Sequence, residues 1–240
     1  MINLLAQIDY AASTGRSVWH RASALTKLVL AAATIAAAIT APRLDALLAV
    51  HLFAWALALT SGLAPRLLLT AAAYPLMFSL LVAAGRWDGT WTTPLMLLMR
   101  PVGAGLVSVW LLGTTPYPDV FAPISRVLPR RAGDGLFLTY RALFALLTRT
   151  DQVWRALRLR GGLAVPARRR LAHAGDGLGL LVVYSAERSR RLYETMRLRG
   201  HTGRVCGCRH WAEVGPRDLV VLGAFAVLVA ITTFGWWRAQ

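Results

Sequence analysis

The sequence predicts an all-α membrane protein with several membrane spans. Its 240 residues are 56% hydrophobic and 16% charged, and their mean hydropathy is +0.50, well above that of ordinary soluble domains. Five apolar runs are long enough to cross a bilayer, and most of the excess positive charge falls in one stretch between the fourth run and the fifth. Together these features predict four N-terminal spans, a basic pair of amphipathic helices and one C-terminal span.

The predicted spans follow from length. A helix needs roughly 17 to 25 residues to cross a hydrocarbon core of about 30 Å. Runs of that length are Ala24 to Ala41, Leu44 to Leu63, Leu67 to Ala84, Thr92 to Gly113 and Leu219 to Trp237. The sequence therefore divides into a membrane domain at 1–113, a cytoplasmic domain at 114–217 and a last span at 218–240. The number of spans becomes six if Val120 to Leu128 or part of Leu136 to Leu147 enters the membrane.

The distribution of charge predicts the topology. The stretch from Thr114 to Arg217 holds 19 of the 27 basic residues and 7 of the 11 acidic ones, a net charge of +12. Arginine-rich segments next to spans stay in the cytoplasm, so we expect a cytoplasmic N-terminus and an external C-terminus. The first twenty residues show no pattern of a cleavable signal peptide, and we expect the first span to be retained.

Two helices are predicted inside the basic stretch. Thr114, Thr115 and Pro116 end the fourth span, because proline does not continue a helix. Apolar residues at helical spacing then predict amphipathic helices from about Asp134 to Arg160 and from about Asp176 to Arg199. We expect the segment between them, with the basic patch Arg168-Arg169-Arg170, to form a turn.

Both predicted helices end in the same four residues. Arg158-Leu159-Arg160-Gly161 recurs 39 positions later as Arg197-Leu198-Arg199-Gly200. The same offset aligns the bulky residues Val153, Trp154 and Leu157 with Leu192, Tyr193 and Met196. The repeat therefore includes a hydrophobic frame as well as a basic ending.

Two compatible interpretations explain the repeated ending. In the first, Gly161 and Gly200 are helix C-caps, and the arginines offset the negative end of the helix dipole. Capping alone does not require a leucine between the arginines or bulky residues upstream. In the second interpretation, the two ends are equivalent docking elements, whose guanidinium groups form bidentate pairs with carboxylates in an acidic groove of another protein.

The sequence lacks the elements of a motor or an enzyme. A phosphate-binding loop needs Gly-Lys-Ser or Gly-Lys-Thr, whereas the only lysine is Lys27, which follows Thr26. The spans contain no paired carboxylates and no nucleophile beside a base. We therefore expect no enzymatic activity and no cofactor bound by this chain; if ATP hydrolysis powers the system, it has to come from a partner chain.

A cluster of soft ligands follows the second repeat. His201, Cys206, Cys208 and His210 supply four side chains within ten residues that suit zinc or a late transition metal. The alternative is a surface connector, because Cys-Gly-Cys lacks the two-residue gap of a zinc knuckle. A structural disulfide is not expected in the cytoplasm.

The paired endings resemble those of a known family. Paired short Ala-Arg-Gly motifs at the ends of two cytoplasmic helices, after four spans, are typical of the transmembrane T component of energy-coupling factor (ECF) transporters, and the chain looks most like the CbiQ type. Further similarities are a basic residue before proline at Arg100, the membrane-exit motif at Thr114, Thr115 and Pro116, and an N-terminal pattern at Asp9, Tyr10, Ser17, His20 and Lys27. Leu159 and Leu198 depart from the family pattern, which has alanine there.

The resemblance implies a role, partners and a location. It implies a scaffold in the bacterial cytoplasmic (inner) membrane whose two coupling helices bind two ABC-type ATPase subunits, which carry ATP and Mg²⁺. It also implies a membrane S component, cobalt-binding and similar to CbiM, and a small accessory membrane subunit. Cobalt is the substrate that the CbiQ type favours, and no nucleic acid is implied.

A rival hypothesis rests on the charge alone. The arginine-rich stretch fits a membrane-anchored module that binds anionic lipid or nucleic acid, since clustered arginines give salt-dependent binding. Such a module would not form a stoichiometric complex with ATPase subunits, whereas a T component would.

Overall fold

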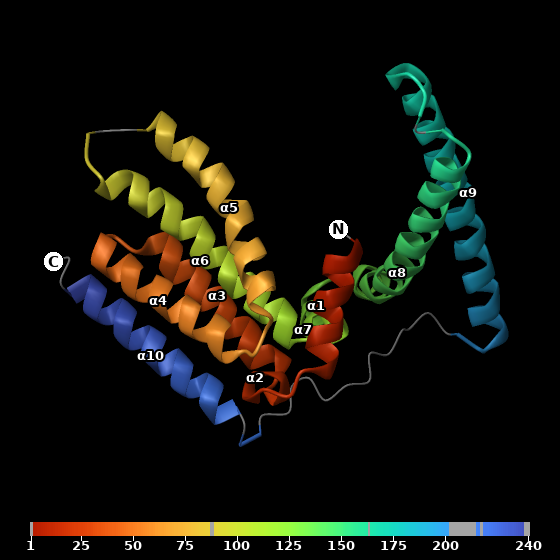
Figure 1. The fold of residues 1–240 in the computed structure, drawn as a ribbon. Helices are drawn as coiled ribbons and strands as arrows, with labels where there is room; N and C mark the ends of the chain where they lie inside the picture. The colour runs from red at the N-terminus through yellow and green to blue at the C-terminus, as the bar shows by residue number, and fades with distance from the viewer. Residues whose placement is uncertain (1, 87–88, 163, 202–214, 217, 238–240) are drawn as a thin grey trace. The chain divides into compact units, whose positions relative to one another are not determined.

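The computed structural model describes residues 2–86, 89–162, 164–201, 215–216 and 218–237. These residues form ten helices and no strand (Figure 1). The chain splits into two compact units, which we call the span unit (residues 1–123 and 209–240) and the arginine unit (residues 124–208). The fold is thus all-α, as the sequence predicts. The domain boundaries at residues 113 and 217 stay a prediction, because compactness does not report which residues lie in the membrane.

Five apolar helices of the span unit match the five predicted runs. They are α3 (Ala24–Thr40), α4 (Leu44–Thr60), α5 (Pro65–Gly85), α6 (Thr92–Thr114) and α10 (Asp218–Trp237). Within the described residues α5, α6 and α10 are long and apolar enough to cross a membrane, while α3 and α4 have 17 residues each. Seventeen residues span only about 26 Å, at the lower limit for a crossing. The number of spans therefore stays a prediction.

Three short helices were not expected from the sequence. They are α1 (Ile2–Thr14), α2 (Val18–Arg21) and α7 (Tyr117–Val127), the last of which overlaps Val120 to Leu128, a segment that the sequence offered only as an alternative sixth span. Packing rather than periodicity accounts for α1: Ile8 is 7% exposed and lies in a cluster with Ala58 of α4 and Leu106 of α6. Pro118 stands in the first turn of α7, where a proline removes no helical hydrogen bond.

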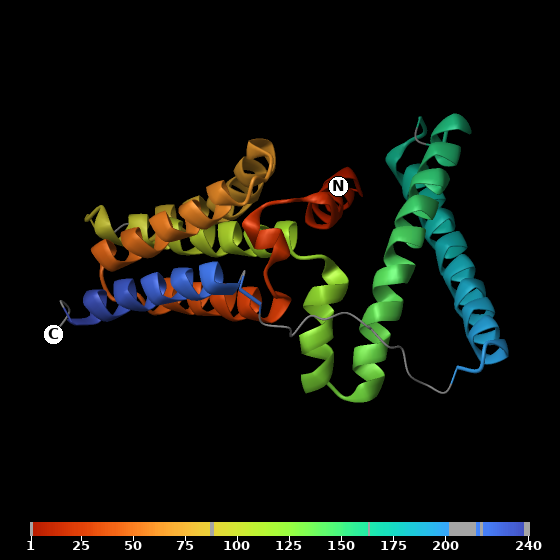
Figure 2. The same cartoon turned by 90° about the horizontal axis from the view of Figure 1, so that it is seen from below.

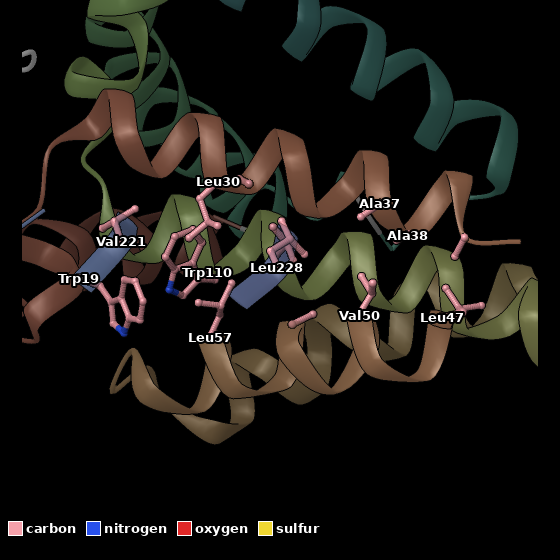
Figure 3. Packing of buried hydrophobic residues seen from close by; sticks show 14 of the residues in the cluster. Trp19, Leu30, Ala37, Ala38, Leu47, Val50, Leu57, Trp110, Val221 and Leu228 are labelled. Atoms are coloured by element: carbon pink, nitrogen blue, oxygen red, sulfur yellow. The ribbon is translucent and has the colours of Figure 1, made fainter. Parts of the chain in front are cut away.

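Small residues and two tryptophans form the core of the span unit. Trp110 of α6 is fully buried, and its ring centroid lies 5.3 Å from that of Trp19 in an edge-to-face arrangement. Figure 3 shows further buried side chains of the same cluster, which are spread along α3, α4 and α10: Leu30, Ala37, Ala38, Leu47, Val50, Leu57, Val221 and Leu228. Because the alanines let helix backbones approach closely, α10 packs alongside α3 and α4 (Figures 1 and 2).

A buried polar junction ties one end of three apolar helices together. Lys27 of α3 is 1% exposed, and its Nζ donates to the Thr114 carbonyl of α6 at 3.0 Å. Asp218 of α10 is also 1% exposed; it accepts from the Ser23 N–H at 2.7 Å and from the Thr26 hydroxyl at 3.1 Å. Each buried charge thus has hydrogen-bond partners, as burial requires.

The arginine unit consists mainly of two long helices, α8 (Arg130–Leu159) and α9 (Ala167–Leu198). They pack against each other and are joined by a short turn, which is clear in Figure 2. The predicted start of the second helix was wrong: α9 begins nine residues before Asp176, so Arg168, Arg169 and Arg170 lie in its first turn and not in a connecting turn. Pro166, with φ −51°, precedes the helix and positions its start, while the basic first turn and later glycines hide that start from the sequence pattern.

Candidate docking ends in the arginine unit

The two Arg-Leu-Arg-Gly segments end α8 and α9 with the same backbone geometry. The residue after each helix is an arginine: Arg160 with φ −82° and ψ 8°, and Arg199 with φ −89° and ψ 12°. Each arginine is followed by a glycine with positive φ, 70° at Gly161 and 75° at Gly200. Only glycine adopts this left-handed conformation without a steric cost, so the predicted C-cap role of both glycines is confirmed.

The hydrogen bonds are also the same at both ends. Gly161 N–H donates to the Arg158 carbonyl at 3.1 Å, and Gly200 N–H donates to the Arg197 carbonyl at 3.0 Å. The next N–H along the chain closes a wider loop: Gly162 to Leu157 at 2.9 Å, and His201 to Met196 at 3.0 Å. This pair of bonds defines a Schellman motif. Both ends are therefore held rigidly by their own backbone.

The side chains of both endings point into solvent. Leu159 and Leu198 are each 88% exposed, and the flanking Arg158, Arg160, Arg197 and Arg199 are exposed as well. Within the described residues none of these four arginines pairs with a carboxylate. Arg197 lies over the Tyr193 ring, 5.8 Å from its centroid. Exposed leucines beside uncompensated cations suit contact with an acidic surface that has an apolar pocket.

The aligned hydrophobic frame is only partly used for internal packing. Val153 and Leu157 are half-buried, and they lie 3.2 and 3.3 Å from the position that a Cβ would take at Gly177. By contrast, Trp154 and Tyr193, which share a repeat position, are 47% and 60% exposed. Each docking end thus has an exposed aromatic ring five residues before its exposed leucine, and Trp and Tyr are enriched among the residues that dominate binding energy.

A second group of arginines lies next to the α8 end. Arg168, Arg169 and Arg170 are exposed in the first turn of α9. Positive charge there destabilises the helix by ~0.3 to 1 kcal/mol per residue, because the N-terminal end of the helix dipole is itself positive. Arg170 folds back onto the turn, its Nη2 donating to the Val165 carbonyl at 3.4 Å. His173 packs on the turn too, with Cδ2 3.6 Å from the Cβ position of Gly162.

The other predicted site residues belong to other segments of the chain. Thr114 is the last residue of α6 and Pro116 precedes α7, so the predicted membrane-exit motif lies in the span unit. Cys206, Cys208 and His210 lie outside the described residues, and the His201 N–H donates a backbone hydrogen bond in the α9 cap. Among the described residues no three metal-ligating side chains come together.

Sequence reasoning missed how His20 is used. Its Nε2 lies 3.2 Å from the carbonyl oxygens of Ala11 and Gly113, and the Ser17 hydroxyl lies 2.7 Å from its Nδ1. Carbonyls only accept, so the proton resides on Nε2 and Nδ1 accepts from Ser17. Burial lowers the pKa of His20 below 6.5, and nearby Lys27 lowers it further, although the two backbone acceptors oppose both effects. A neutral His20 thus ties α1, α2 and the end of α6 together.

Residues 15–207 match the family model of CbiQ, the cobalt transport protein. The chain belongs to this family. The match includes α3 to α6 and both docking ends. No curated protein matched the chain. Family membership makes this chain a membrane component of cobalt transport that works with other subunits. The family is one of transport components and not a known enzyme family.

Proposed function

We propose that this chain is the transmembrane T component of an ECF-type cobalt importer, and that its two docking ends bind two ABC-type ATPase subunits. The observation that supports this most directly is the equality of the two ends. They share cap geometry, hydrogen bonds, exposed leucines and uncompensated arginines. Two equal surfaces fit two equivalent partners better than one.

The chemistry of each end suits an acidic groove. Guanidinium groups form planar, bidentate pairs with carboxylates, and a rigid helix end loses little entropy when it does so. The leucine between the arginines adds apolar contact. Because Leu159 and Leu198 replace the smaller alanine of the family pattern, the groove in this system would need a wider pocket.

Long helices give the ends a means of transmitting motion. With 30 and 32 residues, α8 and α9 extend about 45 and 48 Å. In the proposed cycle, the ATPases bind ATP and Mg²⁺ and shift the two ends. The helices pass this movement to a cobalt-binding S component, with a small accessory subunit beside it. Such coupling requires contacts that differ between the two states. The N-terminus and the arginine unit would both face the cytoplasm.

The test is charge reversal at both ends. In the double variant Arg160→Glu with Arg199→Glu, we expect loss of cobalt uptake and of ATPase co-purification, while the chain still inserts into the membrane. A matched control is Arg141→Glu with Arg190→Glu, which changes two exposed arginines of the same helices away from the caps. Normal uptake and normal ATPase co-purification in the first variant would refute the proposal.

A further inference from the structure

The α8 end and the start of α9 lie at the same tip of the helix pair. Only the short turn from Arg160 to Pro166 separates the two helices. His173 of α9 contacts the turn beside Gly162, and Gly177 lies against Leu157 of α8. Arg170 precedes His173 by three residues, or about 4.5 Å of helix rise, which places it beyond that contact and toward the tip.

Among the described residues, the one internal bond given for the three arginines of this tip is that of Arg170 to the Val165 carbonyl, which leaves their positive charges unpaired. No carboxylate of the described chain pairs with Arg168, Arg169 or Arg170. The nearest acidic residue along α9 is Asp176, and it lies 3.9 Å from His173. Cations in the first turn also oppose the helix dipole. Residues whose charge is unfavourable for their own helix, and which no carboxylate neutralises, are expected mainly at functional sites.

We propose that Arg168, Arg169 and Arg170 extend the docking surface of the α8 end, and that they bind the acidic surface of an ATPase subunit around the groove that receives Arg160. This inference rests on the proposed function and adds three contact residues to it. The tip then presents five arginines, since Arg158 and Arg160 are exposed beside them. Leu159 and Leu171, 88% and 76% exposed, supply apolar contact at the same place.

The occupant is an acidic protein surface because the tip is narrow and its charges are continuous with the docking end. A hairpin tip enters a groove, whereas a lipid surface is better matched by a helix lying flat with all its cations on one face. Charges around a docking point act mainly by steering, so the triad should speed association more than it slows dissociation.

The experiment compares two triple variants of the full chain in nanodiscs. The first is Arg168→Ala with Arg169→Ala and Arg170→Ala. The matched control is Arg188→Ala with Arg190→Ala and Arg191→Ala, three exposed arginines in the same helix far from its start. The probe is the purified ATPase subunit pair of the same transport system, and the measurement is its association rate at low and high salt.

We expect the first variant to associate roughly tenfold more slowly at low salt, with a shallower salt dependence. The control should keep the rate of the unchanged chain. A triple lysine variant at 168 to 170 should restore most of the rate, because steering depends on charge and not on guanidinium geometry.

Two results would overturn the inference. In the first, the alanine triad matches the control while the Arg160 and Arg199 variant loses binding, which leaves the proposed function intact. In the second, the effect of the triad appears only in nanodiscs with anionic phosphatidylglycerol and vanishes in neutral phosphatidylcholine, which identifies lipid as the partner. If the Arg160 and Arg199 variant also binds normally, the proposed function fails as well.

Discussion

The span unit and the arginine unit use charged residues in opposite ways. In the span unit Lys27 and Asp218 are each 1% exposed, and each has hydrogen bonds to a neighbouring helix. In the arginine unit the four arginines of the docking ends are exposed and have no carboxylate partner among the described residues. Charges that are buried and satisfied hold helices together, whereas charges left exposed and uncompensated are available to a partner.

Two glycines, one from each unit, differ in the space around them. A Cβ at Gly15 would lie 2.0 Å from Nε2 of His20, so the span unit leaves no room for a side chain there. In α9, by contrast, a Cβ at Gly179 would meet nothing within 4 Å. The tight contact at Gly15 and the open helix surface at Gly179 imply that the same substitution will have different effects at these two positions.

The largest expected effect tests the polar junction. Asp218→Ala removes the acceptor of the Ser23, Thr26 and Gly215 donors and should lower the free energy of unfolding by about 3 to 5 kcal/mol. Thermal unfolding in detergent measures it. The control is Asp176→Ala, because this side chain is 84% exposed and should change stability by under about 0.5 kcal/mol. Equal effects of the two substitutions would contradict the contrast between the units.

The next effect concerns glycine. Gly15→Ala should destabilise the span unit by about 1 to 3 kcal/mol, because the added methyl group displaces His20. Gly179→Ala should instead stabilise α9 by about 0.5 to 1 kcal/mol, because alanine is the better helix former and its Cβ meets open space. Thermal unfolding of both variants in the same detergent measures whether each substitution lowers or raises the stability of the chain. A destabilising Gly179→Ala would show that another chain or lipid packs there.

The smallest effect is a pH dependence confined to the span unit. Because the pKa of His20 is lowered in the folded chain, the unfolded chain binds a proton first as the pH falls. The stability that neutral His20 contributes is therefore complete above pH 6.5 and is lost progressively below it. The unfolding temperature of the unchanged chain should fall more between about pH 7.5 and 5.5 than that of His20→Gln. An identical fall in both proteins would exclude His20 as the cause.

Helix positions in the span unit were largely predictable, but the limits of the basic helices were not. The apolar runs from Ala24 and Thr92 mark α3 and α6 because a membrane-type helix is apolar over its whole length. The start of α9 was placed at Asp176 because the preceding arginines and glycines resemble a turn. Packing of His173 and Gly177 against the α8 end stabilises those residues as helix, and no local pattern reports such a contact.

For the docking ends, the sequence supplied the residues and the fold supplied their equivalence. The repeat at Arg158 and Arg197 is visible in the sequence, and it predicts capping at Gly161 and Gly200. The matching hydrogen bonds and the 88% exposure of both leucines required the structure. So did the junction of Lys27 with Thr114, because these residues are 87 positions apart.

The sequence by itself determined that this protein is helical and of membrane type, and its motifs gave a resemblance to the family that the family-model match then showed. Helical and membrane character follow from composition and from the length of apolar runs, which are local properties of the chain. The tertiary structure alone decided which charges are buried and which are free. Burial depends on the helices that pack over a side chain: neighbouring helices cover Lys27 and Asp218 in the span unit, whereas the arginines of the docking ends are exposed in the arginine unit.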